Sequence, residues 1–155
     1  MRYNEQTMEE DEYKQAYHTL NQTPCAFEKA ILSGRCHCAY CQRLNIAERE
    51  AVMCQAQAAA VPCAALLAQL RQNATFALKL THLEGPLPHA KEMKVQCGGL
   101  LGLQAVLFPE KAAEQVDNIH ALIQHAIQVF GDLEHLPYQT IVQSIHHYQV
   151  RSSRR

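Results

Sequence analysis

Three cysteines stand close together in the sequence, at Cys36, Cys38 and Cys41. Thiolates bind zinc, cuprous copper and iron-sulfur clusters, because these soft or borderline metals form strong bonds to sulfur. The C-x-C-x-x-C spacing follows Gly34, a turn-favouring residue, and a bent loop can direct several sulfurs at one centre. It matches neither the paired C-x-x-C units of a zinc ribbon nor the full bacterial ferredoxin run. The triad therefore predicts a metal or redox site without naming its metal.

Further ligands must come from the segments on either side of this loop. Residues 42–55 carry apolar side chains near helical spacing, so we expect a helix there. If that helix is unbroken, its rise of 1.5 Å per residue puts Cys41 and Cys54 about 20 Å apart, too far to share one metal. Folding a helix over residues 24–33 antiparallel to it would instead bring Cys25 and Cys54 together.

This helical hairpin, which we place at residues 24–63, divides the thiols into two groups. Cys36, Cys38 and Cys41 form the first group, and Cys25, Cys54 and Cys63 form the second. A break or bend in the helix over residues 42–55 would merge the two groups around one cluster.

Burial is the competing explanation for each cysteine, because free cysteine packs as a small hydrophobic side chain. Cys97, on a helical apolar stripe, is assigned to the core, and the same reading applies individually to Cys54 and Cys63. A short loop has no apolar face, so burial does not readily explain the three cysteines of the triad. Six cysteines between residues 25 and 63 exceed the four of a closed zinc site, which favours an iron-sulfur cluster, [4Fe-4S] first, over zinc.

Histidines and carboxylates add little chemistry. His37, inside the triad loop, is an alternative ligand, but a solvated histidine is the simpler interpretation. His120 and His125 are five residues apart and fall on different helix faces. The sequence has no P-loop, no dinucleotide-binding glycine motif, no nucleophile elbow and no H-E-x-x-H pair, so it gives little support for catalysis and leaves the question of an enzyme open.

The composition and charge of the chain indicate in which compartment it works and which kinds of partner it binds. The 155 residues carry a net charge of −1, which gives no electrostatic signature of a nucleic-acid binder. The amino-terminal stretch lacks the basic and apolar regions of a secretory signal, and no apolar run approaches the roughly 20 residues that cross a bilayer. We therefore expect a cytoplasmic protein, with reduced thiols and no membrane association, whose partner is another protein.

Helical patterns cover most of the remaining chain. They lie at residues 8–21, 61–80, 88–108, 117–130 and 138–150, and Gly34 and Gly131 are expected helix stops. Gly98, Gly99 and Gly102 interrupt the pattern at residues 88–108, which indicates a close helix crossing or a local irregularity.

The sequence thus predicts an all-α, single-domain bundle of about six helices over residues 1–155, with flexible ends at about residues 1–7 and 151–155. The expected function is a cytoplasmic metal-binding protein, with an iron-sulfur cluster for electron transfer or redox sensing or as an accessory subunit. The alternative is a helical adaptor or regulator, held by zinc or by packing alone, that binds a protein partner.

Overall fold

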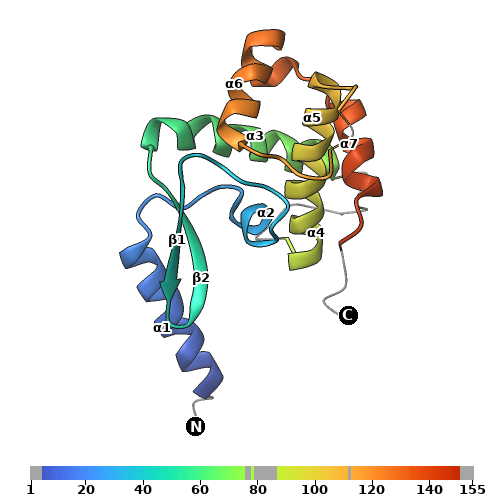
Figure 1. The fold of residues 1–155 in the computed structure, drawn as a ribbon. Helices are drawn as coiled ribbons and strands as arrows, with labels where there is room; N and C mark the ends of the chain where they lie inside the picture. Colours follow the sequence, from blue (N-terminus) through green and yellow to red (C-terminus); the bar gives the residue numbers. More distant parts are fainter. Residues whose placement is uncertain (1–4, 76–77, 79–86, 112, 151–155) are drawn as a thin grey trace.

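The computed structural model describes residues 5–75, 78, 87–111 and 113–150. Its helices are α1 (Glu5–Leu20), α2 (Glu28–Leu32), α3 (Gln57–Ala74), α4 (His89–Met93), α5 (Gly99–Leu107), α6 (Ile119–Phe130) and α7 (Tyr138–His147), with a π-helical turn at Lys94–Gly98 and a 3₁₀ turn at Leu133–His135. Strands β1 (Cys41–Ile46) and β2 (Arg49–Cys54) form an antiparallel hairpin that stands beside α1 (Figure 1). The fold is therefore mixed α and β, and the all-α prediction was wrong.

The error lies in the segment predicted as a helix at residues 42–55. It turns back on itself at Ala47 and Glu48, whose φ angles are 51° and 69°. Tight hairpin turns of this kind need positive φ at both central residues, and Asn-Gly or Asp-Gly is the usual sequence signal. Here Ala and Glu occupy these positions, so the sequence carries no turn signal, and Leu44, Ala51 and Cys54 imitate helical spacing.

Most of the predicted helices are present, with shifted ends. The helix expected at residues 24–33 is reduced to α2, which stops before Gly34 at φ +83°. Gly131, at φ +91°, ends α6 as expected. Of the ends predicted to be flexible, residues 5–7 begin α1, whereas residues 1–4 and 151–155 lie outside the described residues. The last part of the helix expected at residues 61–80 and most of the loop after it also fall outside them.

Glycines let α5 and the π-helical turn pack closely on α7. A Cβ at Gly98 would stand 2.7 Å from the Cα of Ile145, and one at Gly102 would stand 2.8 Å from the Cβ of Ser144. Real Cβ atoms do not approach this closely, so only glycine fits at these positions. Both readings of the glycines are confirmed, since the close crossing occurs where the helix widens into a π turn.

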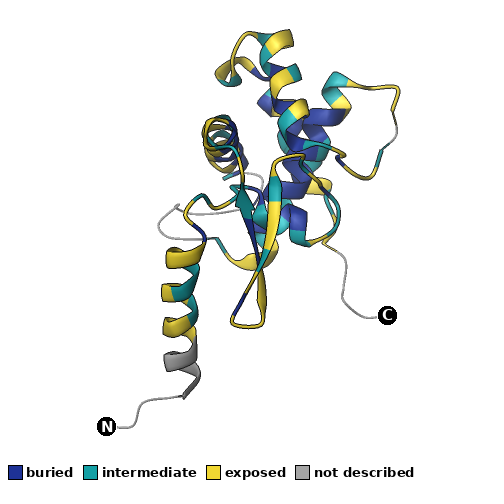
Figure 2. Cartoon of the chain, turned by 60° about the vertical axis from the view of Figure 1, so that its left-hand side comes forward, coloured by how far each residue is buried: buried dark blue, intermediate teal, exposed yellow. Residues whose placement is uncertain are grey.

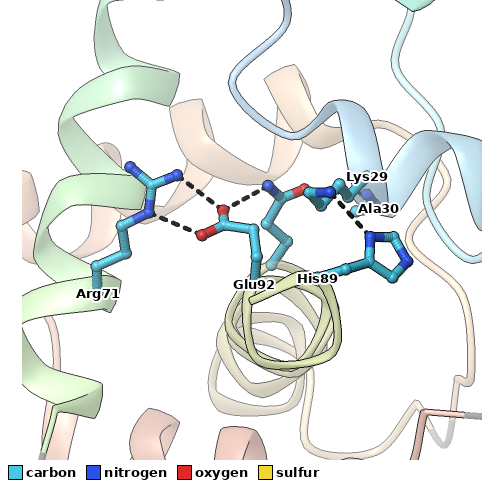
Figure 3. A network of polar contacts seen from close by, with 6 residues as sticks. Lys29, Ala30, Arg71, His89 and Glu92 are labelled. Carbon is cyan, nitrogen blue, oxygen red and sulfur yellow. Dashed lines mark hydrogen bonds and ion pairs between the residues drawn. The ribbon is translucent and has the colours of Figure 1, made fainter. Parts of the chain in front are cut away.

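A buried polar network joins α2, α3 and the helix that starts at His89 (Figure 3). The Glu92 carboxylate is 3% exposed and accepts two hydrogen bonds from Arg71, at 3.0 and 2.9 Å. Gln96 donates to Glu92 at 2.6 Å, and its amide oxygen accepts from the backbone N–H of Ala30 at 3.0 Å. A buried carboxylate needs such compensation. The network fixes α2, the short helix between Cys25 and the triad loop.

The core is formed by α2, β2 and α3 together with the π-helical turn, α5, α6 and α7, whereas α1 exposes most of its surface (Figure 2). The contacts of α1 with the rest of the chain are mainly polar. The Arg49 guanidinium of β2 lies 4.4 Å from the ring centroid of Tyr13. The Tyr17 hydroxyl donates a hydrogen bond to the Glu28 carboxylate at 3.1 Å. Among the described residues, no helix is both long and apolar enough to cross a membrane.

Candidate functional site: a thiol-lined cavity

The hairpin register places two cysteines opposite each other. Cys41, the first residue of β1, pairs with Cys54, the last residue of β2. Directly opposite residues of an antiparallel pair project their side chains from the same face, with Cβ atoms about 4.5–5.5 Å apart. The two thiols therefore come from the same end and the same face of the hairpin.

A third segment extends the hairpin on the other side of β2. Pro24 forms an isolated antiparallel bridge with Met53. The N–H of Cys25 donates to Val52 at 3.0 Å, and the N–H of Cys54 donates to Thr23 at 2.8 Å. Cys25 thus lies next to the end of β2, close to Cys54. The sequence-based hairpin paired these two cysteines as well, although through a helix that does not form.

The triad loop is held against the segment that leads into α6. His37 donates its N–H to Val116 at 2.8 Å, and its carbonyl accepts from Ile119 at 2.8 Å. Asn118 accepts the N–H of Ala39 through its side-chain oxygen at 3.1 Å. These bonds bring the first turn of α6 to the cysteines. His37 itself is exposed, and its side chain does not line the cavity described next.

Five cysteines and one histidine line a single small cavity of about 20 Å³. The lining residues are Cys25, Ala26, Cys38, Cys41, Cys54, Ala59, Ala60, Cys63, Ile119 and His120. Cys63 comes from the first half of α3, so the thiols converge from four separate segments. Such a volume holds one water-sized guest. Apart from the sulfurs and the imidazole, the side chains of the described lining residues are apolar.

Burial raises the pKa of two of the cavity thiols, Cys25 and Cys63. It raises the pKa of Cys25 to about 12, and the neighbouring thiols of Cys63, Cys38 and Cys54 add to this, against a hydrogen bond from the backbone N–H of Phe27 that lowers it. Burial also raises the pKa of Cys63 to about 12, with Cys38 and Cys54 again adding to the effect. The thiols are close enough to oppose one another's ionisation, which a bound cation would reverse.

Cys36 separates from the other two triad members. It is fully buried, and its thiol interacts with that of Cys97 instead of lining the cavity. The hydrogen bond to Cys97 and burial raise the pKa of Cys36. Cys97 is in the core, as predicted, with the Ser33 hydroxyl 3.7 Å from its sulfur, and hydrogen bonds from Cys36, Ser33 and Tyr148 lower its pKa. These residues form a second, separate thiol pair.

Of the six cysteines proposed from sequence, the structure therefore brings Cys25, Cys38, Cys41, Cys54 and Cys63 together. The thiols are neighbours and not a finished coordination sphere: within the described ranges, no three His, Cys, Asp or Glu side chains are already arranged to hold a metal ion. Sequence reasoning missed His120, because only tertiary contact brings it to a loop some eighty residues earlier in the chain.

Comparison of the chain with known protein families, with curated proteins and with solved structures found no match. The function must therefore be argued from the cavity and its donors.

Proposed function

We propose that this protein binds a thiolate-ligated metal centre, with an iron-sulfur cluster as the first candidate, and acts in electron transfer or redox sensing or as an accessory subunit. One observation supports the proposal: five cysteines from four segments line one cavity. The proposed ligands are drawn from Cys25, Cys38, Cys41, Cys54 and Cys63. Cys36 is left out because it faces Cys97.

Hydrophobic packing alone is a poor explanation for five cysteines around one cavity. A hydrophobic core is filled more efficiently by branched side chains, which leave no void between weakly polar groups. Here the sulfurs surround a void, and only Cys63 among the five is as buried as a core residue, at 9% exposure. A positively charged guest would turn mutual repulsion between thiolates into attraction, and metal sites commonly contribute folding energy in this way.

The donor set selects the kind of metal. Among the described residues no carboxylate lines the cavity, which disfavours magnesium, calcium and manganese, whereas sulfur suits iron-sulfur clusters, zinc and cuprous copper. Four thiolates close a tetrahedral zinc site and four also hold a [4Fe-4S] cluster, so the five thiols here suffice for either kind of centre. A cluster is larger than the cavity of about 20 Å³, so its insertion requires the thiols to move apart.

Zinc is the second candidate, and the cavity volume of about 20 Å³ favours it, because a single ion fits without this expansion. Zinc would clasp the hairpin, α3 and the triad loop together, and the protein would then serve as an adaptor or regulator.

Reduced thiols are part of the proposal, which places the protein in the cytoplasm. All seven cysteines lie in the described part of the chain and are free, which is consistent with a reducing compartment. A protein partner fits either candidate function. Tyr40 and Val61 are exposed and are adjacent in sequence to lining residues, so they are candidates for an apolar contact with a partner.

Metal analysis of protein purified without oxygen tests the proposal. An iron-sulfur cluster would appear as a broad visible absorption, with iron and acid-labile sulfide in equal amounts. Zinc at one equivalent, without iron or sulfide, would support the second candidate. Protein that contains no metal, and that takes up neither zinc nor iron with sulfide after full reduction, would overturn the metal proposal.

A further inference from the structure

His120 lies at the second position of α6 and lines the thiol cavity. Its Nδ1 atom is buried and has no hydrogen-bond partner. Leaving a buried polar atom unpaired is energetically unfavourable, and native structures rarely keep one without a reason. An imidazole nitrogen in this state, beside five thiols, has the chemistry of a metal ligand.

The imidazole is also held in place by the cysteine loop itself. The ring of Tyr40, between Cys38 and Cys41, meets the His120 ring edge-on, with centroids 4.8 Å apart at 90°. The backbone bonds of His37 to Val116 and Ile119 fix the chain immediately before His120. The loop that supplies two thiols therefore also positions the imidazole, as is usual for metal-ligating histidines whose orientation is set by neighbours.

We propose that His120 is a nitrogen ligand of the centre, which then carries mixed sulfur and nitrogen ligation. This inference rests on the proposed function and adds to it. In this role the imidazole would donate the Nδ1 lone pair to the metal, and the ligating cysteines would bind as thiolates. Nitrogen ligation raises the reduction potential of an iron-sulfur centre and completes a Cys₃His site for zinc.

His125 provides a matched control on the same helix. It stacks on Phe108 with ring centroids 5.0 Å apart, and it does not line the thiol cavity. Replacing His125 removes an imidazole from α6 without touching the proposed ligands, so the His125→Ala protein should behave as the wild type.

Cobalt(II) titration of the reduced, metal-free protein tests the inference, because cobalt reports its ligands in visible spectra. Sulfur ligation gives charge-transfer absorption, and replacing nitrogen by sulfur or water moves the ligand-field bands to lower energy. We expect His120→Ala to show this shift and to bind cobalt at least about tenfold more weakly, with His125→Ala unchanged. Ligand-field bands and affinity that are the same in His120→Ala and wild type would overturn His120 ligation alone.

The absence of sulfur charge transfer in the wild type would overturn the proposed function together with this inference. X-ray absorption of the cobalt-loaded wild type gives a check that does not depend on how the variant folds. Imidazole outer-shell scattering is expected there, and a spectrum that needs sulfur ligands alone would contradict the inference.

Discussion

Cys41 and Cys54 are register partners at the open end of the β1–β2 hairpin, next to the segment that carries Cys25. This relationship makes the site possible, because a helix over the same residues would separate the two thiols by about 20 Å. The hairpin returns the chain to its starting point, and α3 then begins at Gln57 and carries Cys63 in its first half. The pairing of Cys41 with Cys54 is thus a consequence of one reversal of the chain at residues 47–48.

Serine replacements should separate the cavity thiols from the buried pair. Cys54→Ser removes a thiol that lines the cavity, so we expect zinc or cobalt affinity to fall at least about tenfold. Cys36→Ser is the matched control, since Cys36 belongs to the same sequence triad as Cys38 but faces Cys97. It should retain metal, as measured by metal content and cobalt spectra. Loss of metal from Cys36→Ser with retention in Cys54→Ser would contradict our choice of ligands.

Local sequence patterns predicted part of this site, and the parts that depend on tertiary contacts were not predicted. Cysteine spacing is a local pattern, so the sequence alone predicted the thiol-rich region between residues 25 and 63. The helical apolar pattern likewise predicted the core position of Cys97. The turn at Ala47 and Glu48 has no characteristic residues, so the hairpin and the mixed α and β class were not visible. His120 and the burial of Cys36 depend on tertiary contacts to residues 116–119 and Cys97, which no short-range pattern encodes.

Metal affinity should rise steeply with pH. The pKa values of Cys25 and Cys63 are about 12, so both thiols are protonated at neutral pH and must each release a proton to bind as thiolates. The protons released by these two thiols alone make the apparent zinc affinity increase at least about 100-fold per pH unit. Because both pKa values lie far above neutrality, no plateau is expected between about pH 6 and about pH 8. Competition with a chromophoric chelator measures this slope, and a flat profile would contradict thiol ligation.

The same shifts set the alkaline stability of the metal-free protein. A folded-state pKa above the ordinary thiol value means that the unfolded chain loses these protons first as the pH rises. The stability contribution is therefore complete below about pH 9 and declines between about pH 9 and about pH 12. Urea unfolding across this range should show the decline in metal-free wild type and a smaller decline in Cys25→Ala.

The hairpin turn offers a stabilising substitution. Ala47 and Glu48 hold positive φ angles of 51° and 69°, which cost non-glycine residues about 1 kcal/mol or more each. Replacing the pair with Asn-Gly suits this turn, so we expect the free energy of unfolding to rise by about 1 kcal/mol in urea denaturation. Gly34→Ala is the converse test, because its φ of +83° strains alanine although nothing lies within 4 Å of the added Cβ. It should destabilise by about 1 kcal/mol, and a neutral result in both variants would argue against these backbone angles.

The crossing of α7 over the π-helical turn should tolerate no added methyl group at Gly98. Alanine favours a helix over glycine by about 1 kcal/mol, so an open site would gain stability. At Gly98 the new Cβ would lie 2.7 Å from the Cα of Ile145, a backbone atom that moves only with the whole helix. We therefore expect Gly98→Ala to lower the free energy of unfolding by about 1–3 kcal/mol. Gly99→Ala is the neighbouring comparison: its Cβ would meet the Cδ1 of the buried Leu70 at 2.6 Å, a side-chain atom that can shift without moving a helix backbone. The loss in urea unfolding should be smaller there, and an equal or larger loss in Gly99→Ala would show that backbone contact does not set the cost.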